Sequence, residues 1–291
     1  MRGRYATFRV KSKAEEGIIM TEKIAPNLGD VQSTLLLPLW GRAIETQKKL
    51  PLLHDLAAVE ILNRIDFDFS LINNNLSEIS QRGWVIRSIL IDMGIREFIQ
   101  KYPNATIVNV GCGLDTTFER IENNEITWYD LDLPDVIELR KKLLHEKGNR
   151  RYIDMSFLNY QWFEKLDKKD NILFIAAGLL YYFEEQQVRE FLIRICDSFP
   201  NSEMIFDATS PIGVKTANKM VIQNSGMDIN SFLKWGLKKA KEIEHWDNRI
   251  QVLEEQVFFK NMKKGMKFKN QVTALFSDFL KIQYLVHLRF K

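Results

Sequence analysis

The chain has 291 residues, with 41 Lys and Arg against 38 Asp and Glu, and 45% of it is hydrophobic. This globular composition excludes collagen-like and low-complexity chains, and the net charge of +3 argues against a dedicated nucleic-acid binder. Two cysteines, Cys112 and Cys196, are too few for a disulfide scaffold or a zinc site. No apolar run has membrane-span length, and the charged N-terminus lacks a secretory signal. We therefore expect a soluble, cytoplasmic protein with no membrane or nucleic-acid partner and no metal.

The N-terminal part of the chain is predicted to be helical after a short arm. Residues 1–19 show neither helical nor strand periodicity, so we expect a loose arm there, or a start of translation at Met20. Over 31–65 apolar residues recur at helical spacing. Pro38 and Pro51 are expected to divide this stretch into short helices, because an interior proline removes a backbone donor.

A longer helix is predicted over 76–100, ending before Pro103, since a proline disfavours the helical conformation of the residue before it. With the preceding helices it would form a helical lid or cap over 20–102. The pattern then changes, and 103–291 is expected to form a second domain.

This second domain alternates between predicted strands and helices. Short apolar runs predict strands at 105–110, 126–131, 151–155, 171–177 and 203–207. The runs between them predict helices at 114–122, 134–145 and 185–199. Such alternation is typical of an α/β protein with a parallel sheet and right-handed crossovers.

Two further strands are predicted near the C-terminus, at 251–259 and 282–290. Between them, the segment 259–270 (FKNMKKGMKFKN) contains five lysines and no acidic residue. We expect a solvated hairpin connection here; the alternative is a docking patch for an acidic partner.

The strongest chemical signal lies where the first predicted strand meets a helix. Gly111 and Gly113 allow a ligand to approach the backbone, and the free N–H groups of the turn face it. An acid follows the next strand, about 20 residues on, at Asp130 or Asp132, where nucleotide-binding α/β folds bind ribose hydroxyls. Dinucleotide binders have a third glycine where this chain has Thr116. The pattern therefore favours S-adenosylmethionine, which has no phosphate, over a nicotinamide cofactor.

Four runs carry a resemblance to a known family: SLINNNLSEISQRGWVIRSILIDMGIREFI, NVGCGLDTTFER, WYDLDLPDVIELRKKL and LFIAAGLLYYFEEQQV. They resemble the leucine carboxyl methyltransferase superfamily, and within it the microbial O-methyltransferases associated with polyketide biosynthesis. The resemblance extends from about residue 28 to the C-terminus. It implies a class I methyltransferase fold, a Rossmann-like, mostly parallel sheet of seven strands with an N-terminal helical lid. It also implies S-adenosyl-L-methionine as cofactor.

The resemblance also implies which residues bind this cofactor. Arg87 matches the family's arginine for the cofactor carboxylate, with Arg82 as the fallback, and a guanidinium offers that carboxylate a planar fork. Asp132 matches the acid that binds the ribose, with Asp130 as the alternative. Asp154 matches an acid beside the adenine. The full expected set is Arg87, Gly111, Cys112, Gly113, Asp132, Leu133, Asp154, Met155 and Ala177.

Ala177 departs from the family pattern, which has a glutamate at this position in an Ala-Glu-Gly sequence. An alanine cannot accept a hydrogen bond from the cofactor's amino group, so binding is expected to weaken unless Glu184, Glu185, Asp207 or a water substitutes. We expect an S-adenosylmethionine-dependent O-methyltransferase acting on a carboxylate or hydroxyl of a small molecule. The alternatives are a cofactor-binding protein with little catalysis, or a nicotinamide-dependent oxidoreductase.

No catalytic residue can be assigned from the sequence. His245, Tyr181 and Tyr182 are candidates for lining the acceptor pocket, and ordinary packing or surface exposure explains each of them better. A carboxylate acceptor would be ionised at neutral pH and needs no base, whereas a phenol would gain from one.

Overall fold

The computed structural model describes residues 23–26, 34–70, 72, 76–144, 147–167, 170–223 and 232–291. The expected arm at 1–19 and the alternative start at Met20 lie outside these residues. Among the described residues, no helix combines the length and the hydropathy that a membrane span requires.

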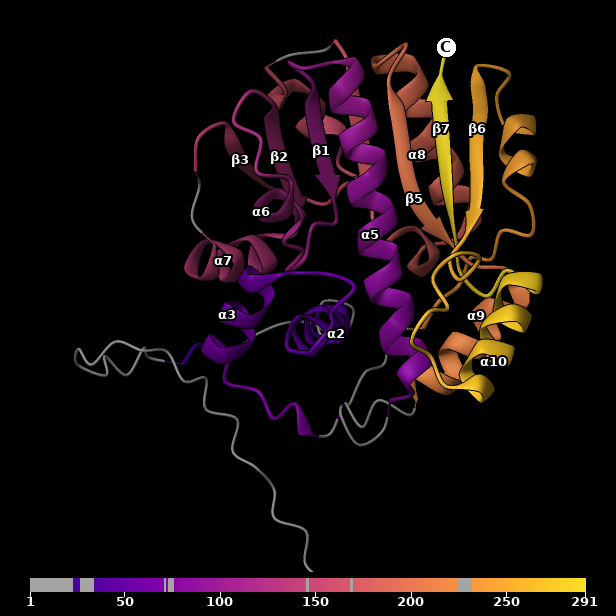
Figure 1. The fold of residues 1–291 in the computed structure, drawn as a ribbon. Coiled ribbons are helices and arrows are strands. Elements are labelled where there is room, and N and C mark those ends of the chain that lie inside the picture. The colour runs from indigo at the N-terminus through magenta and orange to yellow at the C-terminus, as the bar shows by residue number, and fades with distance from the viewer. Residues whose placement is uncertain are drawn as a thin grey trace, which may run out of the picture.

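The centre of the molecule is one twisted sheet of seven strands (Figure 1). Its strands are β1 (Thr106–Val110), β2 (Thr127–Asp132), β3 (Arg150–Asp154), β4 (Ile172–Ala176), β5 (Glu203–Ala208), β6 (Ile250–Val257) and β7 (Tyr284–Phe290). They are ordered β3-β2-β1-β4-β5-β7-β6. The first five strands pair in parallel, and β7 is antiparallel to both β5 and β6. This confirms the expected α/β class, a class I methyltransferase sheet that is mostly parallel.

Helices cover both faces of the sheet and its lower end in Figure 1. The α-helices are α2 (Leu36–Thr46), α3 (Leu56–Arg64), α5 (Glu78–Lys101), α6 (Thr117–Ile121), α7 (Pro134–Leu143), α8 (Glu185–Ser198), α9 (Pro211–Ala217) and α10 (Phe268–Phe279). Short 3-10 or π turns lie between these elements, at Tyr160–Lys165, Leu180–Tyr182, Asn218–Ile222 and Ala240–His245.

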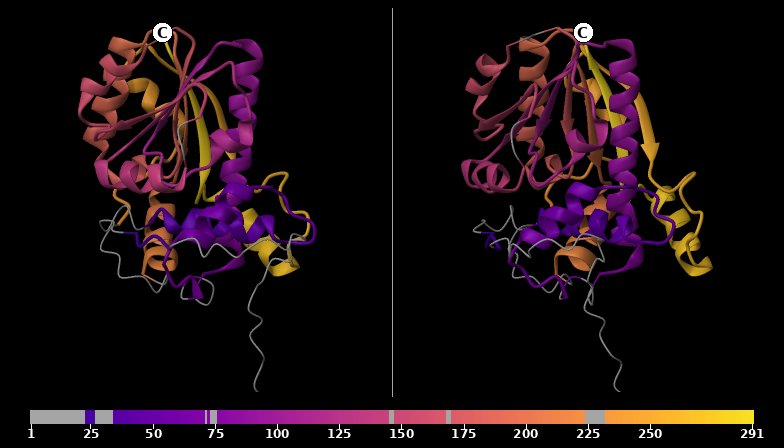
Figure 2. Two further views of the ribbon diagram at one scale, coloured as in Figure 1. Left: turned by 90° about the vertical axis from the view of Figure 1, so that its left-hand side faces the viewer. Right: turned by 60° about the vertical axis from the view of Figure 1, so that its left-hand side comes forward.

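Helix α5 was expected to belong to the cap, but most of it packs on the sheet. Its residues Ile86, Leu90 and Ile95 are buried in one cluster with Ile107 of β1 and Ile205 of β5. The opposite face is covered by α8 and by aromatic side chains, so the sheet is the middle of three layers (Figure 2). Burial on both faces explains why the central strands are continuous apolar runs.

The cap helices α2 and α3 lie across the carboxyl ends of the parallel strands (Figures 1 and 2). Leu36 and Leu39 of α2 and Ile61 of α3 are buried against α7. Pro38 does not interrupt α2, contrary to expectation. It lies in the first turn of the helix, where its missing N–H would have no partner in any case. Pro51 separates α2 from α3, as expected.

The connection between β6 and β7 differs from the expected hairpin loop. The two strands are antiparallel neighbours, as a hairpin requires, but the 12-residue helix α10 lies between them. The lysine-rich segment leads into this helix, and Lys267 is its N-cap residue.

Candidate cofactor and acceptor pocket

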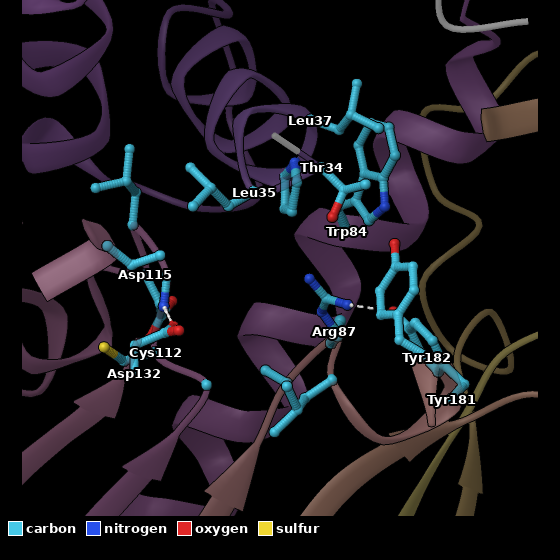
Figure 3. Close-up of a pocket in the computed structure, with 18 of the residues that line it drawn as sticks. Thr34, Leu35, Leu37, Trp84, Arg87, Cys112, Asp115, Asp132, Tyr181 and Tyr182 are labelled. Atoms are coloured by element: carbon cyan, nitrogen blue, oxygen red, sulfur yellow. Dashed lines mark hydrogen bonds between the residues drawn. The ribbon is translucent and has the colours of Figure 1, made fainter. Parts of the chain in front are cut away.

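A cavity of about 260 Å³ lies at the carboxyl ends of the parallel strands, beneath α2. One side is formed by the glycine turn after β1 and the end of β2, and the other by α5 and the segment after β4 (Figure 3). Open α/β sheets bind ligands in this position, because the loops after neighbouring parallel strands separate there. The cavity is therefore the candidate site.

The glycine turn has a backbone conformation that favours glycine. Gly111 and Gly113 have φ angles of +65° and +47°. The N–H groups of Gly111 and Cys112 donate to the carbonyl of Leu131 at 2.8 and 3.1 Å, which ties the turn to β2. A Cβ added to Gly111 would lie 2.6 Å from Cδ1 of Leu179. The N–H groups of the turn are therefore bonded within the protein, contrary to the expectation that they are free to face a ligand. Burial raises the pKa of the Cys112 thiol, so that it stays protonated.

Asp132 faces the cavity from the end of β2 (Figure 3). Its two carboxylate oxygens accept from the N–H of Gly113 at 2.7 Å and of Leu133 at 2.8 Å. Burial raises the pKa of Asp132 to about 6, although these two hydrogen bonds oppose the shift. Each oxygen can accept a second hydrogen bond, so the carboxylate can bind the hydroxyl groups of a sugar.

Asp130, the alternative to Asp132, lies away from the cavity. It is fully buried and accepts from Arg140, Arg150 and Trp128. These guanidinium groups hold the pKa of Asp130 below its ordinary value, against the effect of burial. We name Asp130, Arg140 and Arg150 the β2 charge cluster; its partners are all protein groups, which indicates a structural role.

Arg87 points from α5 into the cavity (Figure 3). Its Nη1 donates to Oδ2 of Asp207 at 2.9 Å and to the hydroxyl of Tyr181 at 3.3 Å. Asp207 also accepts from the N–H of Gly178 at 2.5 Å. The carboxylate of Asp207 raises the pKa of Arg87 despite burial. We name Arg87, Asp207 and Tyr181 the cavity charge group. The fallback Arg82 lies elsewhere, where it donates to the carbonyl of Lys264.

Ala177 lines the cavity and, as a methyl side chain, leaves this position without a carboxylate. Asp207 is the carboxylate beside it, because it bonds to the N–H of the next residue, Gly178. A Cβ on Gly178 would lie 2.8 Å from Nη1 of Arg87, so this glycine lets the arginine pass close to the backbone. The other two suggested substitutes, Glu184 and Glu185, are exposed at the start of α8, where Glu184 forms the capping box.

The structure brings together eight of the nine residues expected to bind the cofactor. Those lining the cavity are Arg87, Gly111, Cys112, Gly113, Asp132, Leu133, Met155 and Ala177. Asp154 is paired with Asp132 in the sheet register, but its side chain is exposed and does not line the cavity. His245 does not line it either, whereas Tyr181 and Tyr182 do.

Several lining residues were not expected from the sequence. Trp84 precedes Arg87 by one helical turn, so helical spacing could have placed it on the same face. Leu37 comes from the cap, and Ile222 and Leu233 come from the segment after α9. No local motif marks these three, because their position depends on how distant segments pack.

Thr116, at the position of the missing third glycine, is buried below the turn. Its hydroxyl donates to Oδ2 of Asp55 at 2.6 Å, and Asp55 also pairs with Arg42 of α2 and Arg120 of α6. Arg42 in turn donates to the carbonyl of Leu114 at 3.0 Å. This network fastens the cap to the glycine turn and explains the threonine as a structural residue.

Comparison with known proteins is consistent with this site. The family model for leucine carboxyl methyltransferases matches residues 36–196. The chain is 29% identical over 255 residues to the tetracenomycin polyketide synthesis O-methyltransferase of Streptomyces glaucescens, covering 87% of this chain and 86% of that protein. It is 26% identical to an S-adenosyl-L-methionine-dependent methyltransferase, dpfgK, of Gibberella zeae, covering 75% of this chain and 78% of the relative.

Among solved structures, the N-methyltransferase NodS of Bradyrhizobium japonicum, in complex with S-adenosyl-L-homocysteine, matches with a TM-score of 0.48 and 12% identity. That alignment covers 90% of this chain and 98% of NodS. Because the family model spans more than half of the 291 residues, the chain belongs to the leucine carboxyl methyltransferase family.

Proposed function

We propose that this protein transfers a methyl group from S-adenosyl-L-methionine to an oxygen atom of a small molecule. The observation that carries the proposal is that Arg87 and Asp132, a cation and an anion, face one cavity from opposite walls beside the glycine turn. Family membership and the O-methyltransferase relative support methyl transfer to oxygen.

The residues of the cavity fit this cofactor. The glycine turn has positive φ angles that suit glycine and lines the cavity, the carboxylate of Asp132 retains acceptor capacity for ribose hydroxyls, and Arg87 retains N–H groups for a carboxylate. Met155 and Leu133 add apolar surface for a nucleobase. When bound, the cofactor supplies an electrophilic methyl group on a sulfonium. The chain's own residues then hold the reactants in line and exclude water.

The remaining wall of the cavity fits an apolar, planar acceptor. It is formed mostly by apolar and aromatic side chains: Leu37, Trp84, Tyr182, Ile222 and Leu233. Such a surface binds through apolar area and aromatic stacking.

Apart from Asp132, which we assign to the ribose, the described residues that line the cavity include no side chain that would act as a general base near neutral pH. Burial raises the pKa of Tyr181 and Tyr182, which keeps both phenols protonated. Asp115 also lines the cavity, but Arg120 and Arg42 lower its pKa. The proposed acceptor is therefore a group that ionises by itself, a carboxylate or an acidic hydroxyl.

The test has two arms. Titration calorimetry with S-adenosylhomocysteine is expected to show one site per chain, and a parallel titration with NADH is expected to show none. Transfer of a labelled methyl group to aromatic carboxylic acids and acidic phenols would then identify the acceptor class. Absence of binding at millimolar S-adenosylhomocysteine would overturn the proposal. Binding without transfer to any natural acceptor would favour the alternative, a cofactor-binding protein with little catalysis.

A further inference from the structure

Helix α10 presents an apolar face to the solvent instead of to the core. Phe268, Leu275, Phe276 and Phe279 are 81%, 53%, 62% and 83% exposed, and Val272 is exposed beside them. At helical spacing these residues form a single face. Exposed single apolar side chains are common, but a contiguous face of three phenylalanines and a leucine indicates an interaction site.

The contacts of α10 fix this orientation. Ala274 is buried, and Asn270 donates to Oε2 of Glu78 in α5 at 2.6 Å. Oδ1 of Asp278 accepts from the N–H of Phe259 at 2.9 Å, and the Gln271 amide donates to the carbonyl of Met266 at 2.8 Å. Asn270 and Ala274 lie opposite the phenylalanines on the helix, and Gln271 and Asp278 lie at one edge of the apolar face. The helix is therefore attached by its polar side, the reverse of an ordinary surface helix.

The lysine-rich segment adds positive charge to one end of this face. Lys260, Lys264, Lys267 and Lys269 are exposed, and none of them forms an ion pair with a residue that the structure describes. Lys267 and Lys269 flank Phe268 in sequence. We name α10 together with these four lysines the α10 surface.

We propose that the α10 surface is a docking site for an acidic partner protein. The partner covers the phenylalanines with an apolar helix face or groove of its own and places its carboxylates against the lysines. Charge complementarity identifies the partner. A second copy of this chain would bring the same unpaired lysines to the interface, so it is disfavoured.

An anionic membrane surface fits this arrangement less well than a protein does. A helix lying in a bilayer interface carries basic residues along both edges of its apolar face. Here the lysines gather at the N-terminal end, while farther along α10 the edges of the apolar face carry Thr273 and Asp278, neither of which is basic. An apolar face with charge at one end is typical of a helix that docks on a protein groove.

The α10 surface is also joined to the pocket. The hydroxyl of Ser210 donates to the carbonyl of Leu280, directly after α10, at 2.7 Å. Thr209 donates to the carbonyl of Ile282 at 2.6 Å, and Thr209 and Gln283 both line the cavity. Figure 1 shows α10 near the carboxyl ends of the parallel strands. A partner on α10 would therefore sit next to the acceptor half of the pocket.

The test uses the full chain and a fluorescent synthetic helix of about 20 residues with glutamates on one face and leucines on the other. A matched helix with lysines in place of the glutamates is the charge control. Fluorescence anisotropy is expected to show salt-sensitive binding of the acidic helix only. Binding should weaken about tenfold or more in Phe276→Ser/Phe279→Ser and in Lys264→Glu/Lys269→Glu.

Two control variants test the location. Leu50→Ser removes another apolar side chain, which is 87% exposed, and Lys141→Glu/Lys147→Glu makes the same charge change beside α7, at the opposite edge of the sheet. Both should bind the acidic helix like the wild type. Calorimetry with S-adenosylhomocysteine reports on folding and should give the same affinity in all variants.

Three results would overturn the proposal. In the first, the acidic helix does not bind, or binds the α10 variants as well as the wild type. In the second, vesicles of anionic phospholipid retain the wild type but not the α10 variants, which makes the surface a membrane site. In the third, sedimentation velocity shows a dimer that the phenylalanine substitutions dissociate.

Discussion

The β2 charge cluster and the cavity charge group contain the same kinds of residue but differ in what remains free. Around Asp130, Oδ1 accepts from Asn109 and Trp128, and Oδ2 accepts from Arg140 and Arg150. In the cavity charge group, only Nη1 of Arg87 donates to a described side chain. Asp130 therefore uses both carboxylate oxygens inside the protein. The cavity charge group keeps part of its hydrogen-bonding capacity directed at the cavity, so burial of a charge alone does not identify a binding residue.

The largest expected effect concerns the β2 charge cluster. Asp130→Ala would leave Arg140 and Arg150 without their carboxylate and should lower the free energy of unfolding by about 3–5 kcal/mol. Asp132→Ala, two residues along the same strand, removes no ion pair and should change it far less. Urea unfolding measures both. Equal losses in the two variants would contradict the division of roles.

The next effect separates binding from stability in the cavity charge group. Arg87→Met alone leaves Asp207 buried without a cation, so both stability and affinity for S-adenosylhomocysteine should fall. The double variant Arg87→Met/Asp207→Asn removes both charges and should recover most of the stability. Its affinity should remain about tenfold to a hundredfold below the wild type, since a charge-assisted hydrogen bond is lost. Recovery of affinity in the double variant would show that Arg87 is only structural.

A smaller effect is expected in the glycine turn. Gly111 and Gly148 both have positive φ, at +65° and +58°, so alanine at either should cost about 1 kcal/mol of unfolding free energy. Gly148 has nothing within 4 Å of a new Cβ, whereas at Gly111 the side chain of Leu179 would have to move. Only Gly111→Ala should weaken binding of S-adenosylhomocysteine in calorimetry. Equal affinities in the two variants would place the ligand away from the turn.

The smallest effect is a pH dependence at Asp132. Its pKa is raised from its ordinary 3.8 to about 6, so the folded state holds this proton more tightly than the unfolded chain does. The protonated carboxyl of Asp132 therefore contributes to the free energy of unfolding below the ordinary pKa, and this contribution is lost as pH rises through about 6. Asp132→Asn should be more stable than the wild type above this pH, and no more stable in acid. Thermal unfolding across this range tests the sign.

Ligand affinity should respond in the opposite direction. The ionised carboxylate is the better acceptor for ribose hydroxyls, so affinity of the wild type for S-adenosylhomocysteine should rise severalfold from about pH 5 to about pH 7. Asp132→Asn should lack this rise. A rise of the same size in the variant would assign it to another group.

The positions of the strands and the α/β class could be predicted, because each strand carries its own signal. The central runs are apolar and β-branched, and the helices between them have the 3.6-residue period. Helix α10 was missed because its apolar face points to solvent and the lysines before it read as a loop. Pro38 was misread as a helix breaker, since sequence alone does not show how far a proline lies from the helix start.

The site was predictable where it depends on local turns, and less so where it depends on packing. Gly111, Gly113 and Asp132 follow directly from strand ends. The pairing of Arg87 with Asp207 joins residues 120 positions apart, and it was not predicted, because it depends on how α5 and β5 pack together. Asp154 is exposed at the end of the edge strand β3, and the residues around it do not reveal that position.

The network that joins Arg42, Asp55 and Thr116 also limits how ligands enter and leave. Lifting α2 from the glycine turn would separate Arg42 from Asp55 or, if Asp55 moved with α2, would separate Asp55 from Arg120, and breaking one such buried pair costs about 3–5 kcal/mol. The state with α2 lifted would be populated in only about one molecule in a hundred to one in several thousand. We therefore expect ligands to enter and leave on the other side of the cavity, near the described apolar residues Ile222 and Leu233. The nucleoside end of the methyl donor would then stay bound while smaller molecules exchange beside it.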